Sequence, residues 1–484
     1  MEILIVFYAI FFLFLAVQHL NWAVMFIIIA LPSYLIRFHI FSLPINLLEL
    51  MIMLAFFVWF VANYYKLKTN LLRNFQKNSN KIKIDYPFKL EIILLLIISF
   101  VAVAVAGFSS SSLGIWKAYF FEPILFFILV LNVFKNEQTA RINLEKILWS
   151  LTLSALIVSI FAIYQKITGA FIFNEFWASV ATRRVTSFFN YPNAVGLYLG
   201  PIILILIGWL TQIIANQKLR IKNCESKIKQ ILEISFIFVT VILSLLAIYF
   251  AKSEGAMLGV IIGLIIFGLL INKKSRLTVF LFIIIFSSSI YVYSPAKNYL
   301  ITKITLSDLS GQIRQQQWEE TLKMLKDKRI ISGAGLANYQ KIIQQYHREG
   351  IFFNSENDPD FHRKTVFNEE YKKKHWQPTE IYLYPHNIIL NFWSELGLAG
   401  LLLFIWIIGK YFYLSIINLF EKKNKYLILG LFGAMIVIVV HGLVDVPYFK
   451  NDLAILFWLL IAMMGVINFE KQVNGSVAEY HIRQ

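Results

Sequence analysis

A histidine–asparagine pair, His386-Asn387, lies where a long polar segment meets the apolar run Ile388–Ile408. An imidazole at such a boundary is placed at the water–lipid interface, where it can meet both a lipid-borne substrate and a soluble acceptor. It can accept the proton of an acceptor hydroxyl while that hydroxyl attacks a second molecule. His386 is therefore the candidate general base of this sequence.

Four cationic side chains at polar segment ends are candidates to bind an anion near that base: Arg183, Arg184, Lys252 and Arg314. Arginine matches phosphate oxygens bidentately, and lysine supplies a point charge. Such a set suits the diphosphate of a polyprenyl carrier whose tail stays in lipid. Because a diphosphate is already a good leaving group, cations can stabilise its departure without a paired carboxylic acid or a metal.

Each of these residues also has a structural interpretation. Arg183 and Arg184 could be interfacial snorkelling residues, and Arg314 could lie on a solvated helix face. His386 could cap the following helix together with Asn387. The position of one residue does not decide between the two interpretations.

A late polar turn adds His441 and Asp445, which could either support a site or form a structural hydrogen bond with each other. Lys252 could likewise pair with Glu254 in its own turn. The convergence of polar groups from four segments on one face favours chemistry over these separate structural roles.

The composition places all of these residues in a membrane protein. The chain has 484 residues, 58% of them hydrophobic, and its mean hydropathy of +0.66 lies outside the soluble range. The sequence predicts an all-α polytopic membrane protein of about 12 spans of ~20 residues each, in which residues 3–36 form one long tilted helix or two short ones. Four parts are expected: transmembrane helices 1 to about 9 in 1–293, one large extracytoplasmic loop in 294–385, C-terminal transmembrane helices in 386–468, and a short cytoplasmic tail in 469–484.

The net charge of +17 sets the orientation of the chain rather than indicating a nucleic-acid partner. Lysine and arginine concentrate in short segments, which the positive-inside rule assigns to the cytoplasm. These segments are 63–89, 216–232, 272–276 and 421–425. The segments then expected on the outer face are 167–192, 251–255, 294–385 and 441–451.

The segment 294–385 is long enough to be functional in its own right. Ser310 is expected to cap a helix that runs to about Lys328, and Leu336–Arg348 to form a second one. The polar stretch 354–376 is expected to be a mobile lid. The single cysteine, Cys224, excludes an intramolecular disulfide and a thiol or cysteine–metal site.

At these residues the chain resembles the O-antigen ligase family of polytopic membrane glycosyltransferases, which also holds O-antigen polymerases and protein O-oligosaccharyltransferases. The resemblance covers most of the chain, and its most specific part is a His-Asn…Glu-x-Gly signature. The matching positions are Arg184 through Asn193, Arg314 through Trp318 and on to Gly335, His386-Asn387 with Glu395 and Gly397, and His441-Gly442 with Asp445.

The resemblance implies that His386 is the catalytic base and Arg184 a diphosphate ligand. It also implies an inverting transferase that needs no metal, and no cofactor is expected. One departure stands out, because Ser253-Glu254-Gly255 occurs where the family commonly has Ser-Arg-Gly. Either Lys252 or Arg314 is expected to replace the arginine missing there.

The sequence therefore predicts a glycosyltransferase of the cytoplasmic membrane, active at its outer face. It would move a glycan from an undecaprenyl-diphosphate type of carrier to a lipid, glycan or protein hydroxyl. An O-antigen or exopolysaccharide polymerase and a protein O-oligosaccharyltransferase remain alternatives within the family. A transporter or flippase of lipid-linked glycans is the alternative from another class, although the spans carry little central charge and show no repeat. A structural membrane subunit would leave the long segment and its His-Asn exit unexplained.

Overall fold

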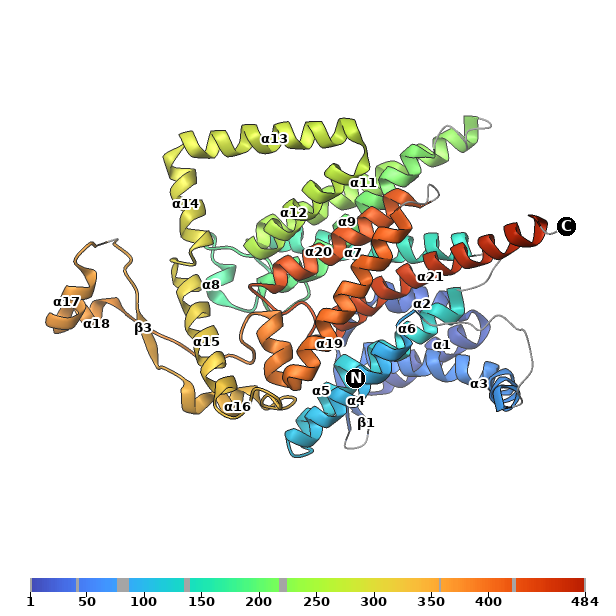
Figure 1. Ribbon diagram of the computed structural model, residues 1–484, viewed down its shortest axis with the longest axis horizontal. Helices are drawn as coiled ribbons and strands as arrows, with labels where there is room; N and C mark the ends of the chain where they lie inside the picture. The colour runs from blue at the N-terminus through green and yellow to red at the C-terminus, as the bar shows by residue number, and fades with distance from the viewer. Residues whose placement is uncertain are drawn as a thin grey trace.

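The computed structural model describes residues 2–40, 43–75, 87–134, 140–216, 224–356, 358–419 and 424–482, and these form an almost entirely helical molecule (Figure 1). The helices are α1 (Glu2–Gln18), α2 (Leu20–Ile29), α3 (Leu47–Phe75), α4 (Lys89–Val105), α5 (Ser110–Trp116), α6 (Glu122–Phe134), α7 (Ala140–Thr168), α8 (Glu175–Ala178), α9 (Pro192–Ala215), α11 (Cys224–Ala251), α12 (Glu254–Ile271), α13 (Lys273–Val292), α14 (Ser294–Ile304), α15 (Leu309–Lys326), α16 (Tyr339–Ile343), α17 (Phe361–Phe367), α18 (Glu369–His375), α19 (Ile388–Leu419), α20 (Lys425–Gly442) and α21 (Asn451–Ile482). Three short helical turns, η1 (Leu31–Leu35), η2 (Lys117–Phe121) and η3 (Gln344–Tyr346), complete the helical part. Two antiparallel hairpins pair β1 (Arg37–Ile40) with β2 (Leu43–Asn46) and β3 (Gly350–Phe352) with β4 (Trp376–Pro378).

Nine helices in the described part of the chain are long and apolar enough to cross a membrane, so the protein is a multi-pass membrane protein. They are Leu47–Tyr64, Ser110–Phe134, Leu144–Thr168, Pro192–Ala215, Lys227–Ala251, Glu254–Ile271, Lys273–Val292, Ile388–Leu419 and Lys425–Gly442. Shorter apolar helices are Ile3–Gln18, Leu20–Ile29 and Asn451–Ile467. The N-terminal residues form two helices that separate at His19, which confirms the second of the two predicted arrangements. The total of about 12 spans stays a prediction.

Glycines allow α9 and α20 to approach closely at the centre of the bundle. A Cβ added at Gly208 would lie 2.6 Å from the Tyr426 carbonyl oxygen and 2.7 Å from the Gly430 Cα. Close backbone approach through small residues is how membrane helices gain packing contacts without a hydrophobic driving force. Most residues of α9 are accordingly buried, whereas no residue of α13 is buried. In Figure 1, α13 runs along the top edge apart from the bundle, and α14 and α15 descend from its end.

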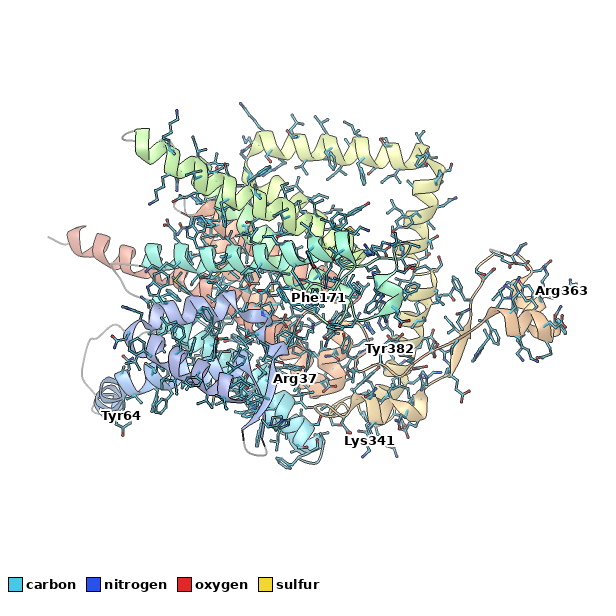
Figure 2. The ribbon with its side chains drawn as sticks, turned by 180° about the vertical axis from the view of Figure 1, so that it is seen from behind. Arg37, Tyr64, Phe171, Lys341, Arg363 and Tyr382 are labelled. Carbon is cyan, nitrogen blue, oxygen red and sulfur yellow. The ribbon has the colours of Figure 1, made fainter. Side chains whose placement is uncertain are left out.

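Residues 294–385 fold into α14 to α18 and the β3–β4 hairpin. The helix expected to start at Ser310 starts at Leu309, because the Asp308 carboxylate caps it by accepting a hydrogen bond from the Gly311 N–H at 3.2 Å. The second expected helix is shorter than Leu336–Arg348 and consists of α16 and η3. The stretch expected to be a mobile lid contains α17 and α18. Figure 2 shows Arg363 at the far tip of this segment and Tyr382 where it returns to the bundle.

A kink in α19 anchors the segment to the bundle. Gly397 has φ of +73° and ψ of −176°, a conformation reserved for glycine, and a Cβ there would overlap the Ile331 carbonyl oxygen. The Leu398 N–H donates to that same oxygen at 3.1 Å, and the Ala334 N–H donates to Ser394 O at 2.6 Å. The Glu395 carboxylate accepts from the Ala337 N–H at 2.7 Å. The Glu-x-Gly signature thus joins the segment to α19, and Glu395 lines neither of the two cavities described below.

Candidate active site

The turn that carries His386 is held from two sides. The Trp318 indole N–H of α15 donates to Pro385 O at 2.9 Å, and the Asn387 amide donates to Leu443 O at 3.1 Å. The Asn387 side-chain oxygen also caps α19 by accepting from the N–H groups of Ile389 and Leu390, at 3.0 and 3.1 Å. His386 itself has φ of +45°. A left-handed conformation at a non-glycine residue costs free energy and persists only where the surroundings enforce it.

His386 lines a cavity of about 200 Å³ whose other walls come mainly from α15. These residues are Leu309, Ser310, Ile313, Arg314, Gln317 and Tyr382. The His386 Nδ1 donates to the Gln317 side-chain oxygen at 3.1 Å. Burial lowers the pKa of His386 below its ordinary value of 6.5, while Asp445 raises it and Arg314 lowers it further. His386 is therefore a neutral imidazole at neutral pH, as a general base must be.

A second cavity, of about 410 Å³, lies between the N-terminal end of α12, the C-terminal end of α20 and the segment α14–α15. Its charged lining residues are the cations Arg184, Lys252, Lys303 and Arg314 and the carboxylates Glu254, Asp308 and Asp445. Asn193, Gly255, Leu258, Leu306, Ser310, His441 and Val444 complete the lining. Four cations face three carboxylates, so the cavity carries a surplus of positive charge.

Arg184 is fixed at the wall of this cavity by a chain of hydrogen bonds. Its guanidinium donates to the carbonyl oxygens of Ala251 and Lys252, at 3.0 and 3.3 Å, and to the Asn193 side-chain oxygen at 3.1 Å. The Asn193 amide in turn donates to Asp445 at 3.2 Å. Burial lowers the pKa of Arg184 and Glu254 raises it, but an arginine keeps its charge in proteins. Three of the predicted residues, Arg184, Asn193 and Asp445, thus form one network.

Arg183 points elsewhere. Its guanidinium donates to the carbonyl oxygens of Lys166, Ile167 and Ala178 at 3.0 to 3.3 Å. It lines neither cavity and instead fastens the 167–192 segment to the end of α7. The arrangement gives Arg183 a structural role.

Glu254 occupies the position where an arginine was expected from the resemblance. Its carboxylate forms an ion pair with Lys303 at 2.8 Å and accepts from the Tyr299 hydroxyl at 2.8 Å. Lys303 also pairs with Asp308 at 2.8 Å. Burial opposes the charge on Lys303, but its hydrogen bonds to Asp308 and Glu254 raise its pKa overall. Both predicted substitutes, Lys252 and Arg314, line the cavity, and Lys303 joins them from α14.

Several polar atoms that face these cavities have no partner among the described residues. The Arg314 Nε, the Gln317 Nε2 and the His441 Nδ1 are buried without a hydrogen bond. Asp445 accepts from Asn193 and from the Val446 N–H, so its carboxylate is engaged away from His441. Buried polar groups in native proteins are rarely left unpaired, so these atoms are available to a ligand or a water molecule in the cavities.

The two cavities share Ser310 and Arg314. Because residues 314 and 317 lie one helical turn apart on α15, Arg314 and Gln317 are directed toward the same side of the helix. The second cavity, called the cationic cavity below, and the cavity beside His386 are thus neighbours, and Arg314 lines both.

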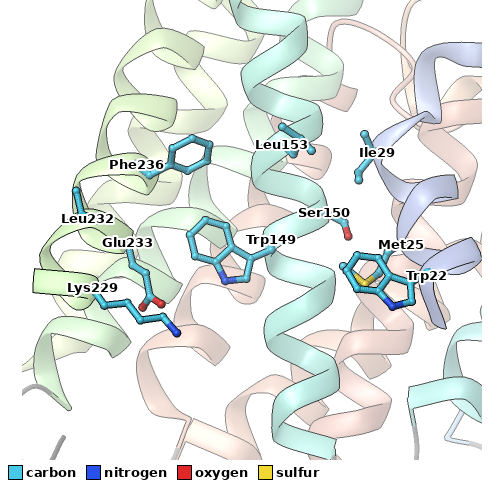
Figure 3. Close-up of a pocket in the computed structure, with 10 residues that line it drawn as sticks. All are labelled: Trp22, Met25, Ile29, Trp149, Ser150, Leu153, Lys229, Leu232, Glu233 and Phe236. Atoms are coloured by element: carbon cyan, nitrogen blue, oxygen red, sulfur yellow. The ribbon is translucent and has the colours of Figure 1, made fainter. Parts of the chain in front are cut away.

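A larger cavity, of about 490 Å³, lies away from this chemistry between α2, α7 and α11 (Figure 3). Trp22 and Met25 line it from α2, Trp149 from α7, and Lys229 and Glu233 from α11. Its walls are mainly apolar, and no residue singled out from the sequence lies there.

The structure adds three residues that the sequence analysis did not select. Gln317 is part of the quoted run from Arg314 to Trp318, and its helical spacing from Arg314 was a usable signal. Tyr382 lies four residues before His386, and their rings are 5.1 Å apart. Lys303 had no signal, because only the fold of α14 across the N-terminal end of α12 brings it to Glu254.

A family model described as O-antigen ligase matches residues 239–405. The match confirms the predicted resemblance over this range, which holds Lys252, Arg314 and His386, whereas Arg184, Asn193, His441 and Asp445 lie outside it. It supports a membrane glycosyltransferase of the O-antigen ligase or polymerase type, which acts on a lipid-linked glycan donor and an acceptor. A search of curated proteins gives no match.

Proposed function

We propose that this membrane protein with an O-antigen ligase segment transfers a glycan from a polyprenyl diphosphate, such as undecaprenyl diphosphate, to an acceptor hydroxyl. The reaction takes place at the outer face of the cytoplasmic membrane. About 12 spans cross that membrane, and residues 294–385 form the extracytoplasmic segment. The positive-inside rule, applied to the basic short segments of the sequence, supports this orientation.

The cationic cavity binds the diphosphate. Arg184 and Arg314 offer planar forks for phosphate oxygens, and Lys252 and Lys303 add point charges. Leu258, Leu306 and Val444 line the same cavity and provide apolar surface beside the charges. Arg183 is left out of this set because its guanidinium is engaged by backbone carbonyls.

His386 deprotonates the acceptor. The acceptor hydroxyl gives its proton to the Nε2 of His386, and its oxygen attacks the anomeric carbon from the face opposite the diphosphate. The bond from that carbon to the phosphate oxygen breaks, and the polyprenyl diphosphate leaves with the electron pair. Attack opposite the leaving group inverts the anomeric centre. The cations stabilise the developing negative charge, so the step requires no metal.

One observation carries the proposal: Arg314 lines both the cationic cavity and the cavity of His386. A diphosphate held in the first would present its glycosyl bond toward a base in the second. A flippase would need ionisable groups along a transmembrane path, whereas these groups gather at one face.

The test is mass spectrometry of the polyprenyl-diphosphate glycan pool in cells that produce the intact protein or His386→Ala. The variant should be present at the normal level and should cause donor to accumulate. Long-chain donor would identify a ligase, and single repeat units a polymerase. His362→Ala is the matched control, since His362 is an exposed histidine of the same segment. An unchanged pool in His386→Ala would overturn the transfer mechanism and favour a flippase or a structural subunit.

A further inference from the structure

Gln317 is nearly buried, with 7% of its surface exposed, although it lies at the wall of a cavity. Its side-chain oxygen accepts the hydrogen of the His386 Nδ1 at 3.1 Å, while its Nε2 has no partner in the described part of the chain. Burying an amide donor without a hydrogen bond costs about 1–3 kcal/mol. The amide oxygen of Gln317 is therefore held by a hydrogen bond, while the amide nitrogen has none in the described part of the chain.

The amide oxygen of Gln317 determines which nitrogen of His386 is the base. In a neutral imidazole one nitrogen carries the hydrogen and the other accepts, and the hydrogen bond of the first sets the tautomer. An amide oxygen can only accept, so Gln317 keeps the hydrogen on Nδ1 and leaves the lone pair on Nε2. The neighbouring rings of Tyr382 and Tyr384 have centroids 5.1 and 4.9 Å from the His386 ring and restrict its rotation.

The amide nitrogen of Gln317 is available in the cavity beside His386, where an acceptor must enter. The cavity of about 200 Å³ is smaller than sites for drug-sized ligands, which measure roughly 300–1,000 Å³. It admits a small part of a ligand, such as one sugar ring. A sugar ring presents hydroxyl and ring oxygens, and these are acceptors for an amide N–H.

We propose that Gln317 is a positioning residue for the acceptor, whose oxygen atom fixes the tautomer of His386 and whose unpaired amide nitrogen binds an oxygen of the incoming sugar. This rests on the proposed function for the identity of the acceptor, but the tautomer part does not. The cavity that Gln317 shares with His386 and Tyr382 is accordingly the acceptor subsite, separate from the cationic cavity.

The first test needs no substrate. In full-length protein labelled with ¹⁵N-histidine and held in lipid nanodiscs, the two ring nitrogens of His386 differ widely in chemical shift, and His386→Ala identifies them. The expected spectrum at neutral pH shows a neutral ring with hydrogen on Nδ1. Hydrogen on Nε2 would overturn the proposal whether or not the protein is a transferase.

The second test uses Gln317→Glu and Gln317→Leu in the same membranes, supplied with lipid-linked glycan extracted from cells that lack the protein. Glutamate still accepts from Nδ1, but its charge favours the imidazolium and should move the acid limb of the pH–rate profile upward by about one unit or more. Leucine should lower kcat at least tenfold and raise KM for the acceptor. Gln315→Glu is the control, because Gln315 is exposed on the same helix and donates to Thr305 O at 3.1 Å.

The outcomes distinguish a failure of the proposed function from a failure of the role of Gln317. Full activity in His386→Ala would overturn the proposed function. Loss of activity in His386→Ala, together with an unchanged pH profile and unchanged KM in both Gln317 variants, would overturn only the role of Gln317. Reduced protein level with normal activity per folded molecule in Gln317→Leu would also overturn it, since that result marks a residue that serves folding alone.

Discussion

Two regions connect the segment 294–385 to the helical bundle, and they differ in how their polar atoms are satisfied. At the kink of α19, Glu395, Ser394 and Ile331 accept hydrogen bonds from backbone N–H groups across the junction. Beside α15, the Arg314 Nε and the Gln317 Nε2 are buried without partners. The first region holds the backbone together, while the second presents polar atoms to cavities. Residues of one sequence signature are therefore divided between a cavity wall, to which His386 belongs, and structural contacts, which Asn387, Glu395 and Gly397 make.

The largest effect is expected from Gly397→Ala, which disrupts the hydrogen-bonded junction at the kink of α19. A Cβ would overlap the Ile331 carbonyl oxygen at a φ that alanine avoids, so little folded protein should be obtained. Size-exclusion chromatography of detergent-extracted protein measures this. Gly409→Ala in the same helix is the control, because no heavy atom lies within 4 Å of the added Cβ. A normal monodisperse yield for Gly397→Ala would show that the junction does not hold the segment.

Arg314→Ala changes the region with unpaired polar atoms beside α15, and it should affect transfer rather than the yield of folded protein. Transfer should fall roughly 10²–10³-fold, the range for removing one group that stabilises developing charge, while the yield of folded protein stays normal. Lys323→Ala, an exposed substitution on the same helix, should change neither quantity. Normal transfer by Arg314→Ala would remove the link between the two cavities.

Arg183 and Arg184 show the same contrast at adjacent positions, because Arg183 holds backbone carbonyls and Arg184 lines the cationic cavity. Arg184→Lys should lower transfer about tenfold at unchanged thermal stability, because lysine cannot bind a diphosphate bidentately. Arg183→Lys should instead lower the unfolding temperature and leave the rate per folded molecule unchanged, since its three carbonyl contacts are structural. The two variants are compared by thermal unfolding and by initial rates. The reverse result would exchange their roles.

The pH dependence tests whether the burial of His386 matters for its role. Burial lowers the pKa of His386 below 6.5, and a general base acts only when it is neutral. Protonation, and with it loss of transfer, should therefore set in below pH 6.5 as the pH falls. The acid limb of kcat/KM measured between pH 4 and 8 locates it. A midpoint above 6.5 would mean that the charged imidazole is favoured in the site.

The smallest effect is expected from Glu254→Gln. Its ion pair with Lys303 is half exposed, and such pairs contribute about 0–1 kcal/mol. Removing the carboxylate should leave stability almost unchanged and lower KM for the donor up to severalfold, because Lys303 is freed for the diphosphate. Titration of donor in the transfer assay measures KM. Complete loss of transfer would give Glu254 a direct part in the reaction.

The sequence predicted the membrane class, the helical fold and the return of His386 to the bundle from strong local signals. Hydropathy and charge asymmetry are properties of short stretches, so they can be read without contacts. The N-cap at Asp308 was missed because Ser310, two residues later, is an equally good cap by type. Lys303 was missed because it meets Glu254 only through the fold of α14 across the N-terminal end of α12. The spacing of Gln317 from Arg314 was a usable signal, but its contact with His386 depends on the fold. The sequence could not show which of the adjacent residues Arg183 and Arg184 lines the cavity, because that depends on the backbone conformation of the 167–192 segment.

The shared position of Arg314 makes the strength of the base depend on the occupancy of the other cavity. Desolvation is the main cause of the low pKa of His386, Asp445 opposes it, and the positive charge of Arg314 lowers it further. A diphosphate bound to Arg314 would cancel that last contribution and make the imidazole more basic. In the proposed mechanism, a bound donor would therefore make proton transfer from the acceptor to His386 more favourable.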